Sequence, residues 1–158
     1  MDSDIQIPML TSGYWDQPRP ADWADVLSDF PLFAGIGKRQ LRKLVRHATV
    51  AEHVPGDTVI QKGTPGDSLY VILGGSARAL GKPASRTLRT GDYFGELSLL
   101  DGTPRSATVL ATGELHVMRL PRQAFIELAE ENPGIALTML NTLGTQIRRL
   151  ETQPALAA

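Results

Sequence analysis

Glycine-containing turns divide the middle of this chain into short segments, and no other feature limits the possible folds so strongly. The segments between the turns, such as 68–73, are rich in Leu, Val and Ile. Short strands at regular spacing are typical of antiparallel barrels and rolls. We therefore predict an antiparallel β-roll, a jelly-roll-like barrel, over about residues 49–118. The turns comprise residues 55–57, 62–67, 74–75, 81–83 and 90–92.

Helical patterns flank the predicted roll at both ends, which makes the fold class α+β. Before the roll, Asp22 can cap a short helix, and a second helix after Gly37 would bury an apolar face of Leu and Val residues. After the roll, helical periodicity returns over about residues 121–152. There, Asn132 precedes Pro133 at a first helical position. The sequence thus predicts N-terminal helices and a C-terminal helix pair around the roll.

Length and composition suit one domain. The chain has 158 residues, of which 42% are hydrophobic, enough for a single core. We expect residues 1–21, which contain three prolines, to form a flexible arm and residues 22–158 to form the domain. A basic start followed by an apolar run, as in a signal peptide, is absent, and so are cysteine and any apolar stretch of membrane-spanning length. These features predict a soluble, cytoplasmic protein with no membrane partner.

The charge pattern argues against nucleic acid as a partner. The net charge is −1, so the chain has no overall surplus of cations for binding a polyanion. One helix does carry a cationic face, which we interpret as solvated surface. A nucleic-acid or acidic-protein partner is the alternative for this face. The face comprises Lys38, Arg39, Arg42, Lys43 and Arg46.

Catalytic patterns are also missing from the sequence. The three histidines are scattered without metal-ligand spacing, and no nucleophile stands in a recognisable pattern with a base. Glu96 and Asp101 form the only imaginable acid pair near the richest motif. We therefore expect no enzyme activity, no metal and no cofactor.

That motif begins at Phe94-Gly95-Glu96 and continues through a short apolar run to Asp101. A helix that starts at a glycine presents unpaired backbone N–H groups, which favour an anion such as phosphate. Glu96 would repel a phosphate, so it suits a sugar hydroxyl instead. Arg105 follows the turn and offers a fork of donors that pairs with phosphate oxygens, and Ser106 adds a hydroxyl. The pattern describes a pocket for a phosphorylated ribose.

The segment 94–109, FGELSLLDGTPRSATV, resembles the phosphate-binding cassette of cyclic nucleotide-binding domains. That family includes the regulatory subunits of cAMP-dependent protein kinase and catabolite-activator-type bacterial regulators. Segments 54–63 and 66–77 are similar to its β-roll signature, so the likeness runs from about residue 31 to 151. The resemblance implies that Glu96 holds the ribose 2′-hydroxyl and Arg105 the cyclic phosphate. The implied ligand-binding residues are Phe94, Gly95, Glu96, Leu97, Ser98, Arg105, Ser106 and Ala107.

Contacts to the purine base are less well defined by the sequence. Alternate residues of 69–73 point to opposite faces of a strand, and the pattern does not decide which face lines the pocket. In relatives, the hairpin near residue 86 and the C-terminal helix can approach the base. Serine after the arginine, at Ser106, favours cAMP over cGMP by family analogy. The candidate base contacts are Val71, Leu73, Arg86, Arg148 and Thr152.

The last helix carries an apolar seam that predicts a partner. Its members repeat at steps of three and four residues, as in a helix that packs along its length. By resemblance, this helix is the dimer helix in bacterial regulators and the lid over the base in other members. We therefore expect a homodimer through the helix over residues 134–151. The seam comprises Ala136, Leu140, Leu143, Ile147 and Leu150.

These observations predict a stand-alone cyclic nucleotide receptor. The residues after 152 are too few for the helix-turn-helix reader that follows the roll in catabolite-activator-type proteins. We expect ligand binding to shift the C-terminal helix and so signal to an unidentified effector protein. A regulatory subunit with a separately encoded partner fits the sequence equally well. The alternative from another class is a dimerising scaffold of the same fold that binds no nucleotide.

Overall fold

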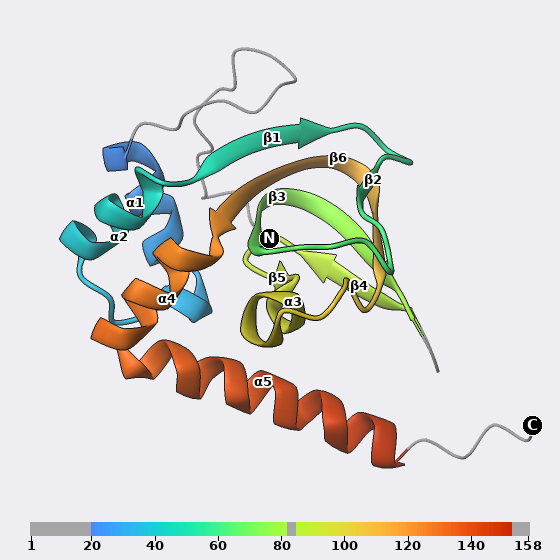
Figure 1. The fold of residues 1–158 in the computed structure, drawn as a ribbon. Helices are drawn as coiled ribbons and strands as arrows, with labels where there is room; N and C mark the ends of the chain where they lie inside the picture. Colours follow the sequence, from blue (N-terminus) through green and yellow to red (C-terminus); the bar gives the residue numbers. More distant parts are fainter. Residues whose placement is uncertain (1–19, 82–84, 153–158) are drawn as a thin grey trace, which may run out of the picture.

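The computed structural model describes residues 20–81 and 85–152, which form a curled antiparallel sheet with helices at one end and along one side (Figure 1). The predicted α+β roll is confirmed, although the sheet is not closed into a barrel. It has six strands, β1 (Thr49–His53), β2 (Thr58–Ile60), β3 (Ser68–Leu80), β4 (Arg86–Arg89), β5 (Tyr93–Phe94) and β6 (Thr108–Pro121). The helices are α1 (Pro20–Ser28), η1 (Pro31–Phe33), α2 (Lys38–Val45), α3 (Glu96–Asp101), α4 (Arg122–Glu131) and α5 (Pro133–Thr152).

Two long strands, β3 and β6, form the centre of the sheet. They pair with each other in antiparallel register from Ser68↔Pro121 to Leu80↔Thr108. β1 and β2 pair with β6, whereas β4 and β5 pair with β3. The pairing of β3 with β5 sets Tyr70 opposite Phe94, so the strand that leads into α3 is fixed to the middle of the sheet.

One hydrophobic core joins the helices to one face of the sheet. Side chains of α1, η1, α2, α4 and α5 pack here against alternate residues of β3 and β6. Leu69, Val71 and Leu73 all belong to this core. The alternation of β3 therefore turns these three residues toward the helices, a parity that the sequence had left open.

A second, smaller core lies inside the curl of the sheet. It includes Tyr70 and Ile72, the residues of β3 that alternate with the first set, together with Phe94 and Val109. The rings of Tyr70 and Phe94 stack with centroids 5.2 Å apart. The Tyr70 ring of this pair also lies beside the guanidinium of Arg105.

The N-terminal helices largely follow the sequence patterns. α2 follows Gly37 and buries Leu41, Leu44 and Val45, as predicted, while its four cationic residues and Arg46, which follows the helix, are exposed. α1 begins at Pro20, before the predicted cap at Asp22, since the fixed φ of proline suits a first helical position. The predicted arm over residues 1–21 lies largely outside the described residues.

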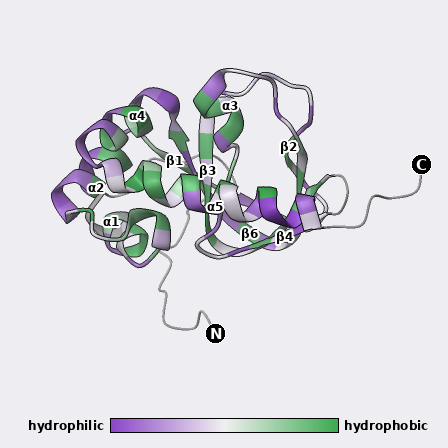
Figure 2. Cartoon of the chain, turned by 90° about the horizontal axis from the view of Figure 1, so that it is seen from below, coloured by the Kyte–Doolittle hydropathy of each residue, from purple (hydrophilic) through white to green (hydrophobic). Residues whose placement is uncertain are grey.

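The long helix α5 begins at Pro133, as predicted, and rests on α4 and η1 while it extends past the open side of the roll (Figure 1). Ile135 and Met139 anchor its first half in the core. Other large apolar residues of α5 are exposed, whereas Leu143 is half-buried. Figure 2 shows hydrophobic residues interspersed with hydrophilic ones along this helix. The exposed members are Leu137, Leu140, Ile147 and Leu150, each 54–62% exposed.

Candidate functional site

The short helix α3 is positioned by two glycines in left-handed conformation. Gly95 precedes the helix with φ of 87°, and Gly102 ends it with φ of 71°. Side chains are strained at such angles, so glycine allows both abrupt changes of direction. Within the helix, Glu96, Ser98 and Leu99 are buried, whereas Leu97 and Leu100 are exposed. The predicted helical turn from the cassette is therefore present, with its acid pointing inward.

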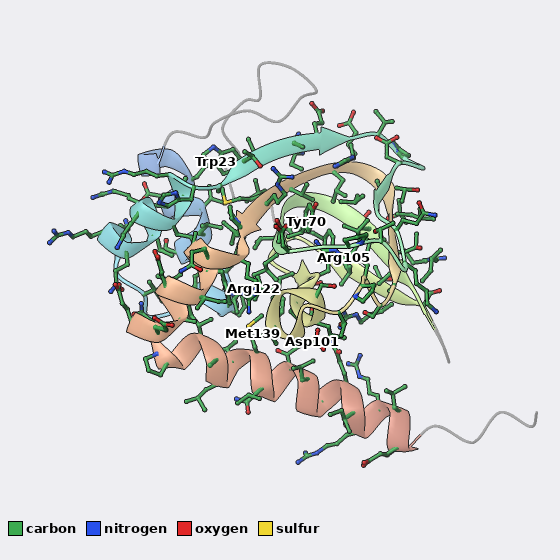
Figure 3. All side chains as sticks on the ribbon, viewed as in Figure 1. Trp23, Tyr70, Asp101, Arg105, Arg122 and Met139 are labelled. Atoms are coloured by element: carbon green, nitrogen blue, oxygen red, sulfur yellow. The ribbon has the colours of Figure 1, made fainter. Side chains whose placement is uncertain are left out.

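Arg105 is a buried cation held by backbone oxygens. Its side chain is only 5% exposed. Its Nη1 donates to the carbonyl of Gly95 and its Nη2 to the carbonyl of Ser68, both at 3.1 Å. The guanidinium carbon also lies 5.5 Å from the centre of the Tyr70 ring (Figure 3), at a distance suited to a cation–π interaction.

The main chain of Arg105 is fixed as firmly as its side chain. Its N–H donates to the carbonyl of Thr64 at 2.9 Å, and its carbonyl accepts from Gly63 at 2.8 Å. Among the described residues, no carboxylate forms a salt bridge with Arg105. The remaining N–H groups of its guanidinium are thus free to bind an anion. A buried, preorganised cation that forms no salt bridge within the described residues is unusual, because burial of a charge costs free energy.

Glu96 is the second buried charged group of the site. Its side chain is 7% exposed, and burial raises the pKa of its carboxyl above the ordinary value. The positive charges of Arg86 and Arg105 oppose that rise without cancelling it. In the described part of the chain, Glu96 forms no salt bridge. The carboxyl is therefore held in the pocket at a cost, ready to accept a hydrogen bond from a ligand.

These groups surround a cavity of about 110 Å³. Every ligand-binding residue that the sequence predicted lines it, from Phe94 to Ser98 and from Arg105 to Ala107. The walls are completed by residues of β2, β3, β6, β4 and α5, namely Ile60, Ala79, Val109, Arg86 and Gln146. The fold thus brings the two halves of the predicted cassette around one space.

A second, larger cavity of about 410 Å³ lies next to the first, between α5, η1 and the turn after β4. Arg86 and Gln146 line both cavities, so the two spaces meet at these side chains. Tyr93 also lines the larger cavity, and burial raises the pKa of its hydroxyl. Threonines of α5 form much of the opposite wall, including Thr142.

The structure places one of the candidate base contacts beside the cavities and the other four away from them. Arg86 lies at the junction of the two cavities. Val71 and Leu73 lie in the core on the helix side, and they line neither cavity. Arg148 and Thr152 are exposed on α5 and also line neither. The periodicity of α5 explains this, since the face toward the roll carries Thr138, Thr142, Thr145, Gln146 and Arg149.

Gln146 was not predicted from the sequence as a cavity residue, although the sequence contains a signal for it. It follows Thr138 and Thr142 at steps of four residues, which places all three on one side of a helix. That side is the one opposite the apolar seam, and a polar stripe facing a roll is a candidate ligand wall.

One hydrogen bond connects the cassette to the helices. Arg122, the first residue of α4, donates from Nε to the carbonyl of Leu99 in α3 at 2.8 Å. The carbonyl group lies near the C-terminal end of α3, where backbone oxygens have no partner within the helix. A displacement of α3 would therefore act on the start of α4, which contacts α5.

Comparison with known proteins identifies the family of this chain. Residues 51–132 match the model of the cyclic nucleotide-binding domain, and the chain belongs to that family. It resembles the regulatory subunit of cAMP-dependent protein kinase from Aspergillus fumigatus, with 35% identity over 65% of this chain and 25% of the relative. It also resembles a cyclic nucleotide-gated potassium channel from Rhizobium etli, with 33% identity over 85% of this chain and 39% of the channel.

Solved structures show the same fold. A PKAR CBD2 structure with bound Sp-2Cl-cAMPS matches with a TM-score of 0.73 and 25% identity, over 87% of this chain and 94% of that one. The catabolite activator protein of Thermus thermophilus matches with a TM-score of 0.65 and 26% identity, over 77% of this chain and 60% of that one. The chain spans only about a quarter to two fifths of the length of the curated relatives it matches.

Within 20–81 and 85–152, no helix combines the length and apolar character that crossing a membrane requires. Over the same residues, no group of three or more His, Cys, Asp or Glu side chains is arranged to hold a metal ion.

Proposed function

We propose that this domain is a receptor for a cyclic nucleotide, with cAMP as its ligand in preference to cGMP. The observation that carries the proposal is the buried guanidinium of Arg105, which lies in the same cavity as the buried carboxyl of Glu96. A cyclic phosphate carries a single negative charge. It would neutralise Arg105, and the hydrogen bonds would be charge-assisted. Ser98 and Ser106 line the same cavity and could add hydroxyl donors to the phosphate oxygens.

The ribose accounts for Glu96. A carboxylate next to a phosphate site is unfavourable unless it has its own donor, and the 2′-hydroxyl of a ribose is such a donor. Glu96 and Arg105 can thus hold neighbouring groups of one ligand. The preference for cAMP rests on Ser106, by family analogy, and on the likeness to cAMP-dependent kinase regulatory subunits.

The base would extend into the larger cavity. The smaller cavity, about 110 Å³, has room for the sugar and phosphate, and Arg86 and Gln146 stand where the two spaces meet. A purine placed there would contact the polar face of α5. Binding would then favour the position of α5 that closes on the base, which gives a change of surface for an effector protein to recognise. The bond from Arg122 to Leu99 offers a second route from α3 to the helices.

The outer face of α5 supports a homodimer. Four large apolar residues stand exposed along it, and a solvent-facing stripe of this kind favours packing against another helix. A second copy of α5 would present the same stripe. The dimer and the effector are both part of the proposal, as is the cytoplasmic location.

Paired calorimetric titrations test the proposal. We expect cAMP to bind, and Arg105→Ala to weaken binding by more than about tenfold, because the phosphate loses a charge-assisted partner worth about 1.5–3 kcal/mol. The analogue 2′-deoxy-cAMP should bind more weakly than cAMP, and cGMP, titrated alongside, more weakly as well. Equal affinity for cAMP in the parent protein and in Arg105→Ala would refute the phosphate site. Absence of any binding would favour the alternative, a dimerising scaffold that uses no nucleotide.

A further inference from the structure

We propose that Gly66 is a positioning residue for Arg105, because its lack of a side chain leaves the space that the guanidinium occupies. Gly66 lies in the loop between β2 and β3. The inference rests on the proposed function, in which Arg105 binds the phosphate, and it assigns a role to a glycine far from the cassette in the sequence.

Geometry at Gly66 carries the inference. A β-carbon built on this residue would overlap the Nε and Cζ atoms of Arg105 and would lie 2.6 Å from Nη2. Contacts below 3.0 Å are essentially never made by real β-carbons. Any side chain at this position would therefore force the guanidinium out of its present place.

Backbone conformation gives no other reason for glycine at this position. The glycines with positive φ include Gly56 and Gly63 in the neighbouring turns, but Gly66 is not among them. A β-carbon at Gly56 or Gly63 would meet no atom within 4 Å, although their angles favour glycine. Gly66 shows the reverse combination. At Gly66 the structure therefore depends on the absence of a β-carbon, which leaves room for the Arg105 guanidinium, and not on conformational freedom.

Other groups around the Arg105 guanidinium also restrict its position. On another side, a β-carbon at Gly95 would lie 2.6 Å from Nη1, and this glycine also needs its positive φ. The carbonyls of Ser68 and Gly95 accept from the two terminal nitrogens, and the Tyr70 ring lies alongside. Arg105 is thus held in a slot with glycine on two sides. A methyl group at residue 66 would separate it from both carbonyls.

The atoms that a methyl group would displace belong to the far half of a flexible side chain. Arg105 can therefore rotate away while the fold survives. We expect Gly66→Ala to remain folded and to bind cAMP more than about tenfold more weakly, close to the effect of Arg105→Ala. Gly37→Ala is the matched control, since Gly37 has a φ of −64° and open space around its Cα. It should bind cAMP like the parent.

A double-mutant cycle separates positioning from general damage. In the Arg105→Ala background the space beside residue 66 is empty, so adding Gly66→Ala should cause no further loss of affinity. A structural role for Gly66 would instead weaken binding or stability by the same factor in both backgrounds. Thermal unfolding of the four proteins reports the stability arm of this cycle without any ligand.

A direct reading of Arg105 in the unligated protein completes the test. The NMR signal of its Nε–H, assigned by its loss in Arg105→Ala, should move or broaden in Gly66→Ala and keep its position in Gly37→Ala. An unmoved signal, or a Gly66→Ala protein that binds cAMP as tightly as the parent while Arg105→Ala does not, would overturn the positioning role alone. If Arg105→Ala itself binds as tightly as the parent, the proposed function fails, and the NMR signal still decides the role of Gly66.

Discussion

Replacement of Glu96 by glutamine should change ligand affinity and stability in opposite directions. The Glu96 carboxyl is buried without a salt bridge among the described residues, and burial raises its pKa. An acid whose pKa is higher in the folded protein than in the unfolded chain binds its proton more tightly when folded. Its contribution to stability is complete below the unfolded pKa and is lost as the pH rises through the folded pKa. At neutral pH the ionised carboxylate therefore destabilises the unligated protein.

Glu96→Gln removes the charge and keeps the shape. The glutamine amide is still a buried polar group, so we expect a net gain in stability on the order of 1 kcal/mol at about pH 7.5. For a domain of this size, that corresponds to a rise of roughly 2–4 °C in the melting temperature. The gain should disappear near about pH 3, below the usual pKa of about 4.3 for an unfolded glutamate, where the carboxyl of the parent is protonated in both states.

Affinity should fall in the same variant. A hydrogen bond to a charged acceptor contributes about 1.5–3 kcal/mol and a neutral one about 0.5–1.5 kcal/mol. The difference of about 1–1.5 kcal/mol predicts a loss of roughly five- to twelvefold in cAMP affinity. Thermal unfolding at the two pH values and calorimetric titration measure both effects. A glutamine variant that is less stable than the parent at neutral pH, or that binds cAMP equally well, would refute the view of Glu96 as a buried ligand group.

Two further predictions concern the helices. Leu140 and Ile147 are 61% and 54% exposed, and charged residues in their place should halve the mass in analytical ultracentrifugation without lowering the melting temperature. The same change at the exposed polar residue Asn141 should leave the mass unaltered. An unchanged mass in the double variant would refute the proposed dimer. Arg122→Ala should retain cAMP affinity within a few-fold, at a cost of about 1 kcal/mol or less. It should reduce the ligand-induced change in the signal of a fluorescent probe at residue 149 of α5. A full response would exclude the hydrogen bond between Arg122 and Leu99 as a route of coupling.

The cassette could be predicted closely from the sequence because its chemistry is local. A glycine before a short apolar run, an acid in the first turn and an arginine after a proline turn are all read within residues 94–107. The fold then brings them around one cavity, and their role in binding a nucleotide stays a prediction. The positions of helices α2 and α5 could be predicted equally well, since each helix has a clear apolar face and a glycine or proline at its start.

Long-range contacts explain what the sequence could not supply. The direction in which Val71 and Leu73 point depends on which face of β3 the helices cover, and alternation alone is symmetric. Gly66 looked like an ordinary turn glycine, because its neighbour Arg105 is close only after β2 and β3 have folded against β6. The place of Gln146 in the cavity wall could be predicted only if it were known that α5 turns its polar side to the roll and its apolar side outward.

The structure of the protein crystallised with saturating cAMP would test the central claim most directly. We predict that the cyclic phosphate lies within hydrogen-bond distance of the Arg105 guanidinium, that the ribose 2′-hydroxyl donates to Glu96, and that the base extends toward Arg86 and Gln146. A cavity filled by the protein's own side chains, or a nucleotide bound elsewhere with Arg105 still bonded only to the carbonyls of Gly95 and Ser68, would contradict the account.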